Sequence, residues 1–212
     1  DTKVLRGIKR FINYQFKCIN CEFYMKDITN NEMRFVLSIF KSPELEYNAN
    51  SISKLIGISS MGALKIAKRL EKENVLVSRE LGKAKFYRLN ASSDYVREYV
   101  KFLLKREAEQ AHPYVKVWIH ELKKLKSADA AILFGSVLRR YREAGDIDAV
   151  LITDEKRFAK LKGEVEEVNS VNVKKLHPVY QSKEDFARNI RKGDKVLLNA
   201  LKGVVVFGED LL

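Results

Sequence analysis

Apolar positions recur every three or four residues in the first part of the chain, a spacing typical of helices that bury one face. The spacing predicts a helix from about residue 30 to the Ser42–Pro43 break, and a short helix over 51–56. A third helix is predicted from Ser59 or Ser60 to about residue 72. Three closely spaced amphipathic helices are typical of a small helical domain.

The pattern then changes to two β-type runs over 75–80 and 85–89, joined by a turn at 81–84. Helices followed by a basic hairpin predict a winged helix-turn-helix domain over 25–91. The segment resembles winged-helix transcription regulators, in particular through the run from Ile52 to Ser60. The resemblance implies that the helix after this turn enters the major groove of double-stranded DNA while the wing lies beside the backbone or minor groove.

The next stretch, 92–127, is expected to be a helical region that links two domains. Ser92 or Ser93 is its expected cap, as Asn30 or Asn31 is for the first helix of the chain. Pro113 in its interior predicts a break or kink near His112. Its surplus of apolar side chains also fits a dimer seam, and a symmetric homodimer is the usual arrangement for such DNA readers.

Beyond residue 127, short apolar runs alternate with helical segments. Strands are expected over 130–134, 147–153, 171–177 and 204–207, with helices over 136–142, 156–168, 183–192 and 194–201. This order predicts a second domain over 128–212 in which helices pack on one sheet, and an α+β fold for the whole chain.

The net charge of +12 is placed unevenly along the chain. Residues 25–126 hold 20 Lys and Arg against 12 Asp and Glu, whereas 127–212 hold 15 against 14. The excess indicates a polyanionic partner for the first domain, and nucleic acid is the obvious candidate. The candidate DNA contacts lie on the third helix and the wing: Ser60, Lys65, Lys68, Arg69, Arg79, Lys83, Lys85 and Arg88. The alternative is a solvated face on a protein-interaction module.

Two carboxylates dominate the chemistry of the second domain. Asp146 and Asp148 flank Ile147 at the start of a predicted strand, so both side chains point the same way and can grip one hard cation. Gly135 and Ser136 lie at a strand-to-helix turn, where a phosphate can approach the main chain and the helix dipole favours anions. The pattern indicates a site for Mg²⁺ and a nucleoside triphosphate, for which ATP is the first choice.

The combination of Gly135 and Ser136, nine further residues, and Asp146, Ile147 and Asp148 between apolar runs resembles the signature of polymerase β-type nucleotidyltransferases, especially the minimal members. The resemblance covers about 128–208, and the whole chain resembles predicted archaeal regulators that fuse a winged helix to such a domain. It implies a mixed sheet and Mg²⁺-dependent transfer of a nucleoside monophosphate, with Asp146 and Asp148 as metal ligands and catalytic residues.

Nearby arginines, Arg139, Arg140 and Arg142, are close enough in sequence to contact phosphates, and the first two are the preferred candidates. Active relatives commonly carry a third carboxylate on the next strand. Asn172 occupies the likeliest equivalent position here, and an amide cannot take a proton near neutral pH.

Two functions are therefore expected as alternatives. The first is a DNA-tethered nucleotidyltransferase that modifies an acceptor such as a protein. The second is a transcription regulator whose second domain binds a nucleotide or a partner without turnover.

The remaining features add less. No apolar run approaches the roughly 20 residues needed to cross a bilayer, so we expect a soluble cytoplasmic protein without a membrane partner. Residues 1–24 are expected to be an N-terminal extension. Cys18 and Cys21 are half of a zinc site at most, and a redox pair or plain thiols are the other readings.

Overall fold

A computed structural model describes residues 28–211. Its first helix, α2 (Asn30–Phe40), is capped by Thr29 rather than by Asn30 or Asn31. The Thr29 hydroxyl accepts from the Glu32 N–H at 3.2 Å, and the Glu32 carboxylate accepts from the Thr29 N–H at 2.9 Å. This reciprocal capping box satisfies two N–H groups that a helix start otherwise leaves free.

Five further elements complete the reading unit, which we define as residues 28–91. A short strand, β1 (Tyr47–Asn48), leads into α3 (Ala49–Ile56), and α4 (Ser60–Lys72) follows. The hairpin of β2 (Leu76–Leu81) and β3 (Ala84–Leu89) pairs with β1 in the order β1-β3-β2. This arrangement confirms the predicted winged helix-turn-helix and adds a strand that the pattern did not reveal.

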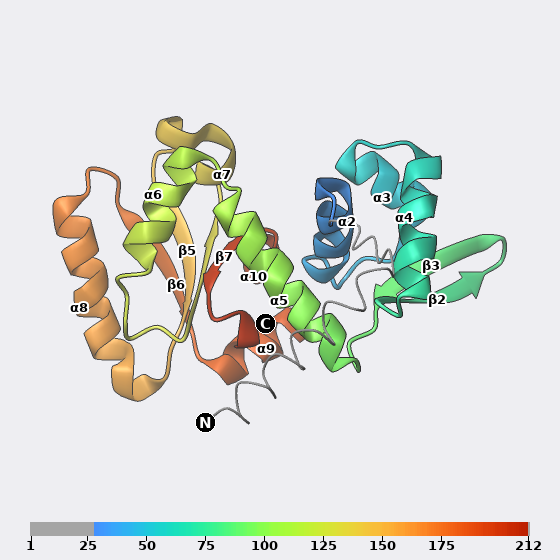
Figure 1. The fold of residues 1–212 in the computed structure, drawn as a ribbon. Helices are drawn as coiled ribbons and strands as arrows, with labels where there is room; N and C mark the ends of the chain where they lie inside the picture. Colours follow the sequence, from blue (N-terminus) through green and yellow to red (C-terminus); the bar gives the residue numbers. More distant parts are fainter. Residues whose placement is uncertain (1–27, 212) are drawn as a thin grey trace, which may run out of the picture.

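The predicted linking region contains two helices separated at the expected break. Helix α5 (Asp94–Glu109) follows Ser93, whose side chain makes no capping hydrogen bond. Helix α6 (Pro113–Leu122) begins at the proline, because the first turn of a helix needs no proline N–H. Figure 1 shows α5 running between the reading unit and the sheet of the second half.

The second half of the molecule is built on a mixed sheet of four strands in the order β6-β5-β4-β7. Strands β4 (Ala130–Phe134) and β5 (Ile147–Ile152) are antiparallel, and β7 (Val204–Phe207) is antiparallel to β4. Strand β6 (Leu176–Gln181) is parallel to β5. This mixed pairing agrees with the expected α+β fold.

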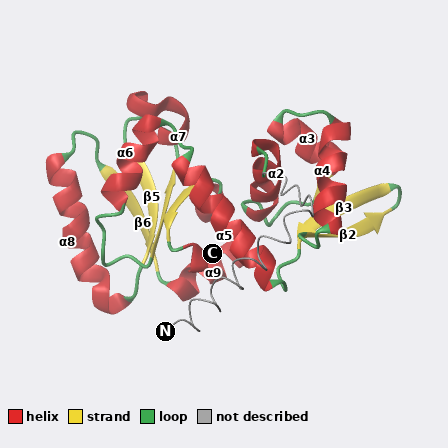
Figure 2. Cartoon of the chain, in the orientation of Figure 1, coloured by secondary structure: helices red, strands yellow, loops and turns green. Residues whose placement is uncertain are grey.

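Helices cover both faces of this sheet (Figure 2). Leu133, Ala149 and Leu151 pack against α6 and α8 (Glu155–Val171) on one face. Ile132 and Val150 belong to the opposite face, in a core shared with α5, α9 (Lys183–Arg191) and α10 (Lys195–Leu201). The remaining short elements are α7 (Val137–Arg140) and the 3-10 turns η1 (Tyr141–Glu143) and η2 (Glu209–Leu211).

The expected strand over 171–177 was placed too early in the sequence. Helix α8 continues to Val171, and the strand starts only at Leu176. Asn169 holds the segment between them in place, because its side-chain oxygen accepts a hydrogen bond from the Leu176 N–H at 2.7 Å. Val171 and Val173, which suggested a strand, are largely exposed.

The two halves share a core rather than meeting through a free linker. Buried side chains of α2 and α5 belong to the same apolar cluster as Ile132 and Val205 of the sheet. Lys41, which is buried, pairs with Glu107 of α5 and donates to the Gly203 carbonyl at 2.6 Å. Burial lowers the pKa of Lys41, and Glu107 opposes that effect. A charged side chain from the reading unit is thus anchored in the second half.

No helix within residues 28–211 is both long and apolar enough to span a bilayer.

Candidate nucleic-acid face and carboxylate site

The turn between α3 and α4 has the geometry expected of a helix-turn-helix. Gly57 ends α3 with φ of 71°, a left-handed conformation that glycine adopts without steric cost. Ser59 caps α4 by accepting from the Gly62 N–H at 3.0 Å. The Ser60 hydroxyl is exposed and forms hydrogen bonds with Asn50 and Ser53 at the start of α4.

Three of the candidate DNA contacts are exposed lysines. Lys65 and Lys68 lie on α4, and Lys83 lies at the tip of the wing beside Gly82. None of the three forms an ion pair with another residue of 28–211. Their ammonium groups can therefore bind phosphates without first breaking an internal pair.

The other basic groups of the wing are held by acidic neighbours. Arg79 and Arg88 both pair with Glu46, with Arg88 Nη2 2.8 Å from Glu46 Oε1. Lys85 Nζ lies 2.8 Å from the Glu71 carboxylate. Hydrogen bonds from Lys85 and Ser78 hold the pKa of Glu71 below its ordinary value. These cations remain accessible to solvent, but each already forms an ion pair with a carboxylate.

Arg69, another candidate DNA contact, is engaged by carboxylates within the reading unit and is only partly exposed. Its side chain is only 23% exposed and pairs with Glu32, which is 6% exposed. Its Nε atom lies 3.3 Å from Glu73. Because Glu32 also belongs to the capping box of α2, its ion pair with Arg69 connects α2 to α4 within the reading unit.

The carboxylate site lies at one end of the four-stranded sheet. Asp148 stands on β5 directly between Phe134 of β4 and His177 of β6. Asp146, two residues earlier, has its Oδ2 atom 3.7 Å from His177 Nδ1. The structure therefore brings both predicted carboxylates together, and adds an imidazole that looked isolated in the sequence.

Gly135 is required by the packing of this site. Its φ is 82°, and a methyl group added to its Cα would overlap the Asp148 carboxylate. The main chain at the turn therefore lies against the carboxylate, which a larger residue would prevent. A group bound by Asp148 would lie next to the Gly135 backbone.

The environment raises the pKa of the Asp148 carboxyl above its ordinary value. Burial is the largest cause, the negative charge of Asp146 adds to it, and His177 opposes it. A cation bound beside Asp148 would offset the repulsion that the Asp146 charge exerts on its ionised carboxylate.

Ser136 occupies the cap position of α7, as expected, but its side chain makes no capping bond. Its Oγ atom is buried and has no hydrogen-bond partner within residues 28–211. A buried hydroxyl without a partner costs free energy unless a ligand or water satisfies it. Arg139 and Arg140 follow on α7 with exposed side chains.

Sequence reasoning missed the residues that position this turn. Tyr141 has a left-handed backbone with φ of 49°, which is unfavourable for a side chain with Cβ. The ring of His112 stacks on it with ring centroids 3.7 Å apart. His112 lies far from Tyr141 in the sequence, so no local signal indicated this contact.

Asn172 does not occupy the third position of the carboxylate site. It ends α8, where its amide donates to the Val168 carbonyl at 2.9 Å and to Glu121 at 3.2 Å. The error follows from the misplaced strand. The residue beside Asp148 on the next strand is His177.

Within residues 28–211, no group of three or more His, Cys, Asp or Glu side chains is arranged to hold a metal ion by protein ligands alone. Cys18 and Cys21, and the expected extension over 1–24, lie outside the described residues.

No protein-family model and no curated protein match the chain. Solved structures that it resembles include the adhesin competence repressor AdcR from Streptococcus pyogenes, at 14% identity over 57% of this chain and 83% of that one, with a TM-score of 0.36. The homodimeric winged helix-turn-helix DNA-binding domain of Mb0332 from Mycobacterium bovis matches at 13% identity over 40% and 73%, with a TM-score of 0.31.

The transcriptional regulator Tm0710 from Thermotoga maritima matches at 21% identity over 59% of this chain and 90% of that one, with a TM-score of 0.30. All three TM-scores are below 0.5, so the winged helix is identified from the elements of this chain itself.

Proposed function

We propose that the protein is a regulator that binds double-stranded DNA through α4 and the wing. The observation that carries this proposal is the exposed pair Lys65 and Lys68 on the helix after the Gly57 turn, together with Lys83 at the wing tip. In a winged helix this helix enters the major groove and the wing lies along the backbone. Figure 1 shows the hairpin of β2 and β3 projecting away from the body of the molecule, which leaves it free to do so.

The salt dependence of binding to a DNA duplex tests this proposal. Each phosphate contact that is lost should reduce the magnitude of the slope of log K against log salt by about 0.9, so Lys65→Gln with Lys68→Gln should reduce it by about 2 for each bound protomer. The matched control is Lys160→Gln with Lys162→Gln, which removes the same charge from exposed positions on α8. Equal slopes for the two double variants would contradict the proposed face.

Light scattering of the free and bound protein would test the symmetric homodimer that we propose as the binding form.

We further propose that the carboxylate site binds Mg²⁺ with a nucleoside triphosphate, first of all ATP. Mg²⁺ is commonly held by one or two carboxylates together with the phosphates of its nucleotide, so Asp146 and Asp148 are a sufficient protein contribution. The glycine at the turn and the unpartnered Ser136 hydroxyl fit an oxygen-rich ligand at this place. Bound Mg²⁺ would neutralise phosphate charge, and the exposed Arg139 and Arg140 could contact the outer phosphates.

Binding without turnover is the version that the site residues favour. His177 stands where a third carboxylate would complete a second metal site, and imidazole suits Mg²⁺ poorly. Transfer of a nucleoside monophosphate to an acceptor such as a protein is the alternative. ATP labelled in its nucleoside monophosphate part separates the two functions, because transfer would leave label on the acceptor. Loss of this labelling in Asp148→Asn would assign the transfer to this site.

Ser136→Ala gives a sharper test of nucleotide binding. Because Oγ makes no hydrogen bond in the free protein, its removal should leave the folding stability unchanged or slightly higher. If Oγ binds a phosphate, the same change should weaken calorimetric binding of Mg²⁺ and ATP by about tenfold. Asp185→Asn, which alters an exposed ion pair on α9, is the control. Unchanged affinity in Ser136→Ala and in Asp148→Asn would refute the nucleotide site.

A further inference from the structure

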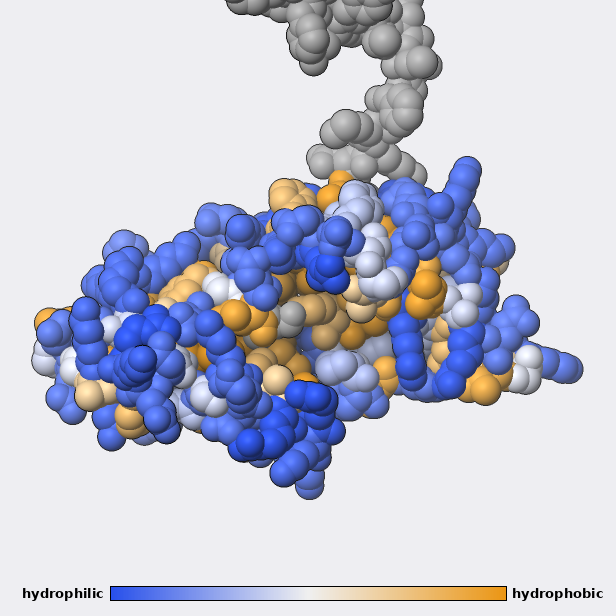
Figure 3. All heavy atoms as spheres, turned by 90° about the horizontal axis from the view of Figure 1, so that it is seen from below, coloured by the Kyte–Doolittle hydropathy of each residue, from blue (hydrophilic) through white to orange (hydrophobic). Residues whose placement is uncertain are grey.

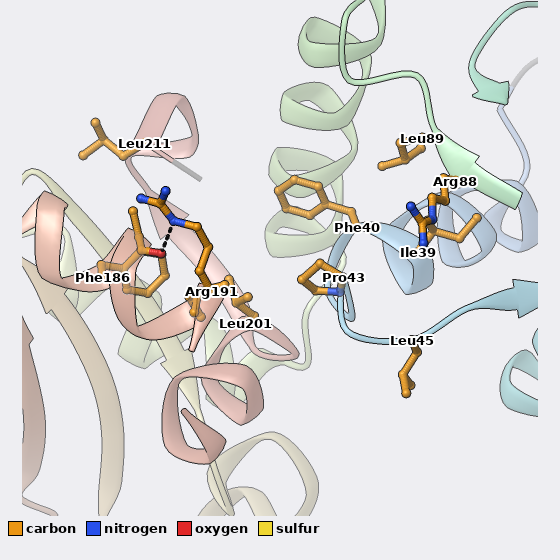
Figure 4. A pocket seen from close by; sticks show the side chains of 12 residues that line it. Ile39, Phe40, Pro43, Leu45, Arg88, Leu89, Phe186, Arg191, Leu201 and Leu211 are labelled. Atoms are coloured by element: carbon orange, nitrogen blue, oxygen red, sulfur yellow. Dashed lines mark hydrogen bonds between the residues drawn. The ribbon is translucent and has the colours of Figure 1, made fainter. Parts of the chain in front are cut away.

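A cleft of about 570 Å³ lies between the reading unit and the second half of the molecule. Figure 3 shows apolar side chains gathered in a hollow on the underside of the molecule. In Figure 4 the end of α2 and strand β3 form one wall of the cleft, with Phe40 and Leu89, and α9 and α10 form the facing wall, with Phe186 and Leu201. Clefts of this volume between two structural units are typical small-molecule sites.

Most of the lining contributed by residues 28–211 is apolar, and its charged side chains are two arginines. Arg88 lies on the wall of the reading unit and Arg191 on the wall of α9 (Figure 4). Among the described residues, no acidic side chain lines the cleft. Its chemistry therefore selects a molecule with an apolar body and a negative group, and disfavours one with a positive charge.

The two arginines are not equivalent. Arg88 is engaged by Glu46 at 2.8 Å. Arg191 donates from Nε to the Ala187 carbonyl at 3.1 Å, within its own helix, and pairs with no carboxylate side chain of residues 28–211. Its outer nitrogens are therefore available to bind a carboxylate with two parallel hydrogen bonds. The negative group of a ligand would sit at Arg191, with the apolar body between Phe40 and Phe186.

Residues 1–24 are an alternative occupant, but their charge argues against it. That segment holds five Lys and Arg against two Asp and Glu, and it would meet the arginines of the cleft with like charge.

We infer that this cleft binds a small anionic amphiphile, a carboxylate with a hydrocarbon body, whose head group is held by Arg191. Apart from Arg88, which is also a candidate DNA contact, the lining is distinct from the DNA face and the carboxylate site, so the inference goes beyond the function proposed above. A ligand here would contact both halves of the molecule at once.

Isothermal titration of the full chain with hexanoate, octanoate and decanoate tests the inference. Each buried CH₂ group should raise the affinity by about three- to fourfold until the cleft is filled. Decanol, which has the same body and no charge, should bind about tenfold more weakly than decanoate. Equal affinity of decanol and decanoate, or the absence of saturable decanoate binding, would overturn the inference.

Variants separate this cleft from non-specific binding. Arg191→Gln should weaken decanoate binding by about tenfold, whereas Arg188→Gln on the same helix, whose side chain pairs with Asp185, should leave it unchanged. Arg88→Gln should have a smaller effect than Arg191→Gln. Ala187→Trp should block the cleft from its exposed rim without disturbing buried packing. Decanoate binding that survives both Ala187→Trp and Arg191→Gln would place the ligand elsewhere and refute the assignment.

Discussion

The basic face of the reading unit and the carboxylate site of the second half use charge in opposite ways. On α4 and the wing, side chains of one charge are spread over the surface, and several of them are paired with Glu46 and Glu71. At the sheet, Asp146 and Asp148 are crowded together beside Gly135 without a compensating lysine or arginine among residues 28–211. A dispersed surface of this kind suits an extended polyanion, whereas a crowded pair suits one compact cation.

The difference also determines how strongly a single substitution should affect the stability of each region. Long exposed side chains can move, and one lysine of the face can be replaced at small cost to the fold. The carboxylate site rests on packing, because the main chain at Gly135 and the Asp148 side chain are in contact. We therefore expect mutations to act on binding in the first region and on stability as well in the second.

The largest effect should come from Gly135→Ala. The new methyl group meets the Asp148 carboxylate, and alanine is also unfavourable at φ of 82°. Together these should lower the free energy of unfolding by about 3 kcal/mol, as measured by chemical denaturation.

Gly82→Ala is the matched control on the wing. It has φ of 59°, but a Cβ there would meet nothing within 4 Å, so only the backbone cost of about 1 kcal/mol is expected. Equal losses for the two variants would mean that the contact with Asp148 does not shape the turn.

A smaller effect should separate two neighbours on α4. Arg69→Gln leaves the buried Glu32 carboxylate without its cation and should cost about 2 kcal/mol of stability. Lys68→Gln removes an exposed charge and should leave stability within about 0.5 kcal/mol, while it weakens DNA binding. Denaturation curves of both variants, compared with their DNA affinities at one salt concentration, test this. A stability loss for Lys68→Gln equal to that of Arg69→Gln would remove the distinction.

The smallest effect is expected for Asp148→Asn at neutral pH, where a rise in Tm of no more than about 2 °C should follow. The pKa of Asp148 is raised in the folded protein, so its ionised form disfavours the fold. The advantage of the variant should therefore shrink as the pH falls through the raised pKa, because the wild-type carboxyl is then protonated. Thermal unfolding followed at several pH values measures this, and a variant that is less stable than wild type at neutral pH would contradict it.

The order of helices and strands in each half could be predicted from sequence because it follows from local periodicity and from Pro and Gly signals. Pro113 marked the break between α5 and α6, and the apolar run over 130–134 is β4 as predicted. The spacing of Gly135, Ser136, Asp146 and Asp148 indicated one site for the same reason, since strand alternation and a tight turn are local properties. The prediction of a strand over 171–177 was wrong, because the exposed Val171 and Val173 give the sequence a strand-like alternation.

The contacts between residues far apart in the sequence were decided by the tertiary structure. Sequence alone determined that the chain is basic in its first part, carries a winged helix, and places two carboxylates on one side of a strand. Only the fold decided that Arg69 turns inward to Glu32, that His177 rather than Asn172 stands beside Asp148, and that His112 stacks on Tyr141. The physical reason is that strand pairing and helix packing join residues far apart in the chain, and no spacing along the sequence records which of them meet.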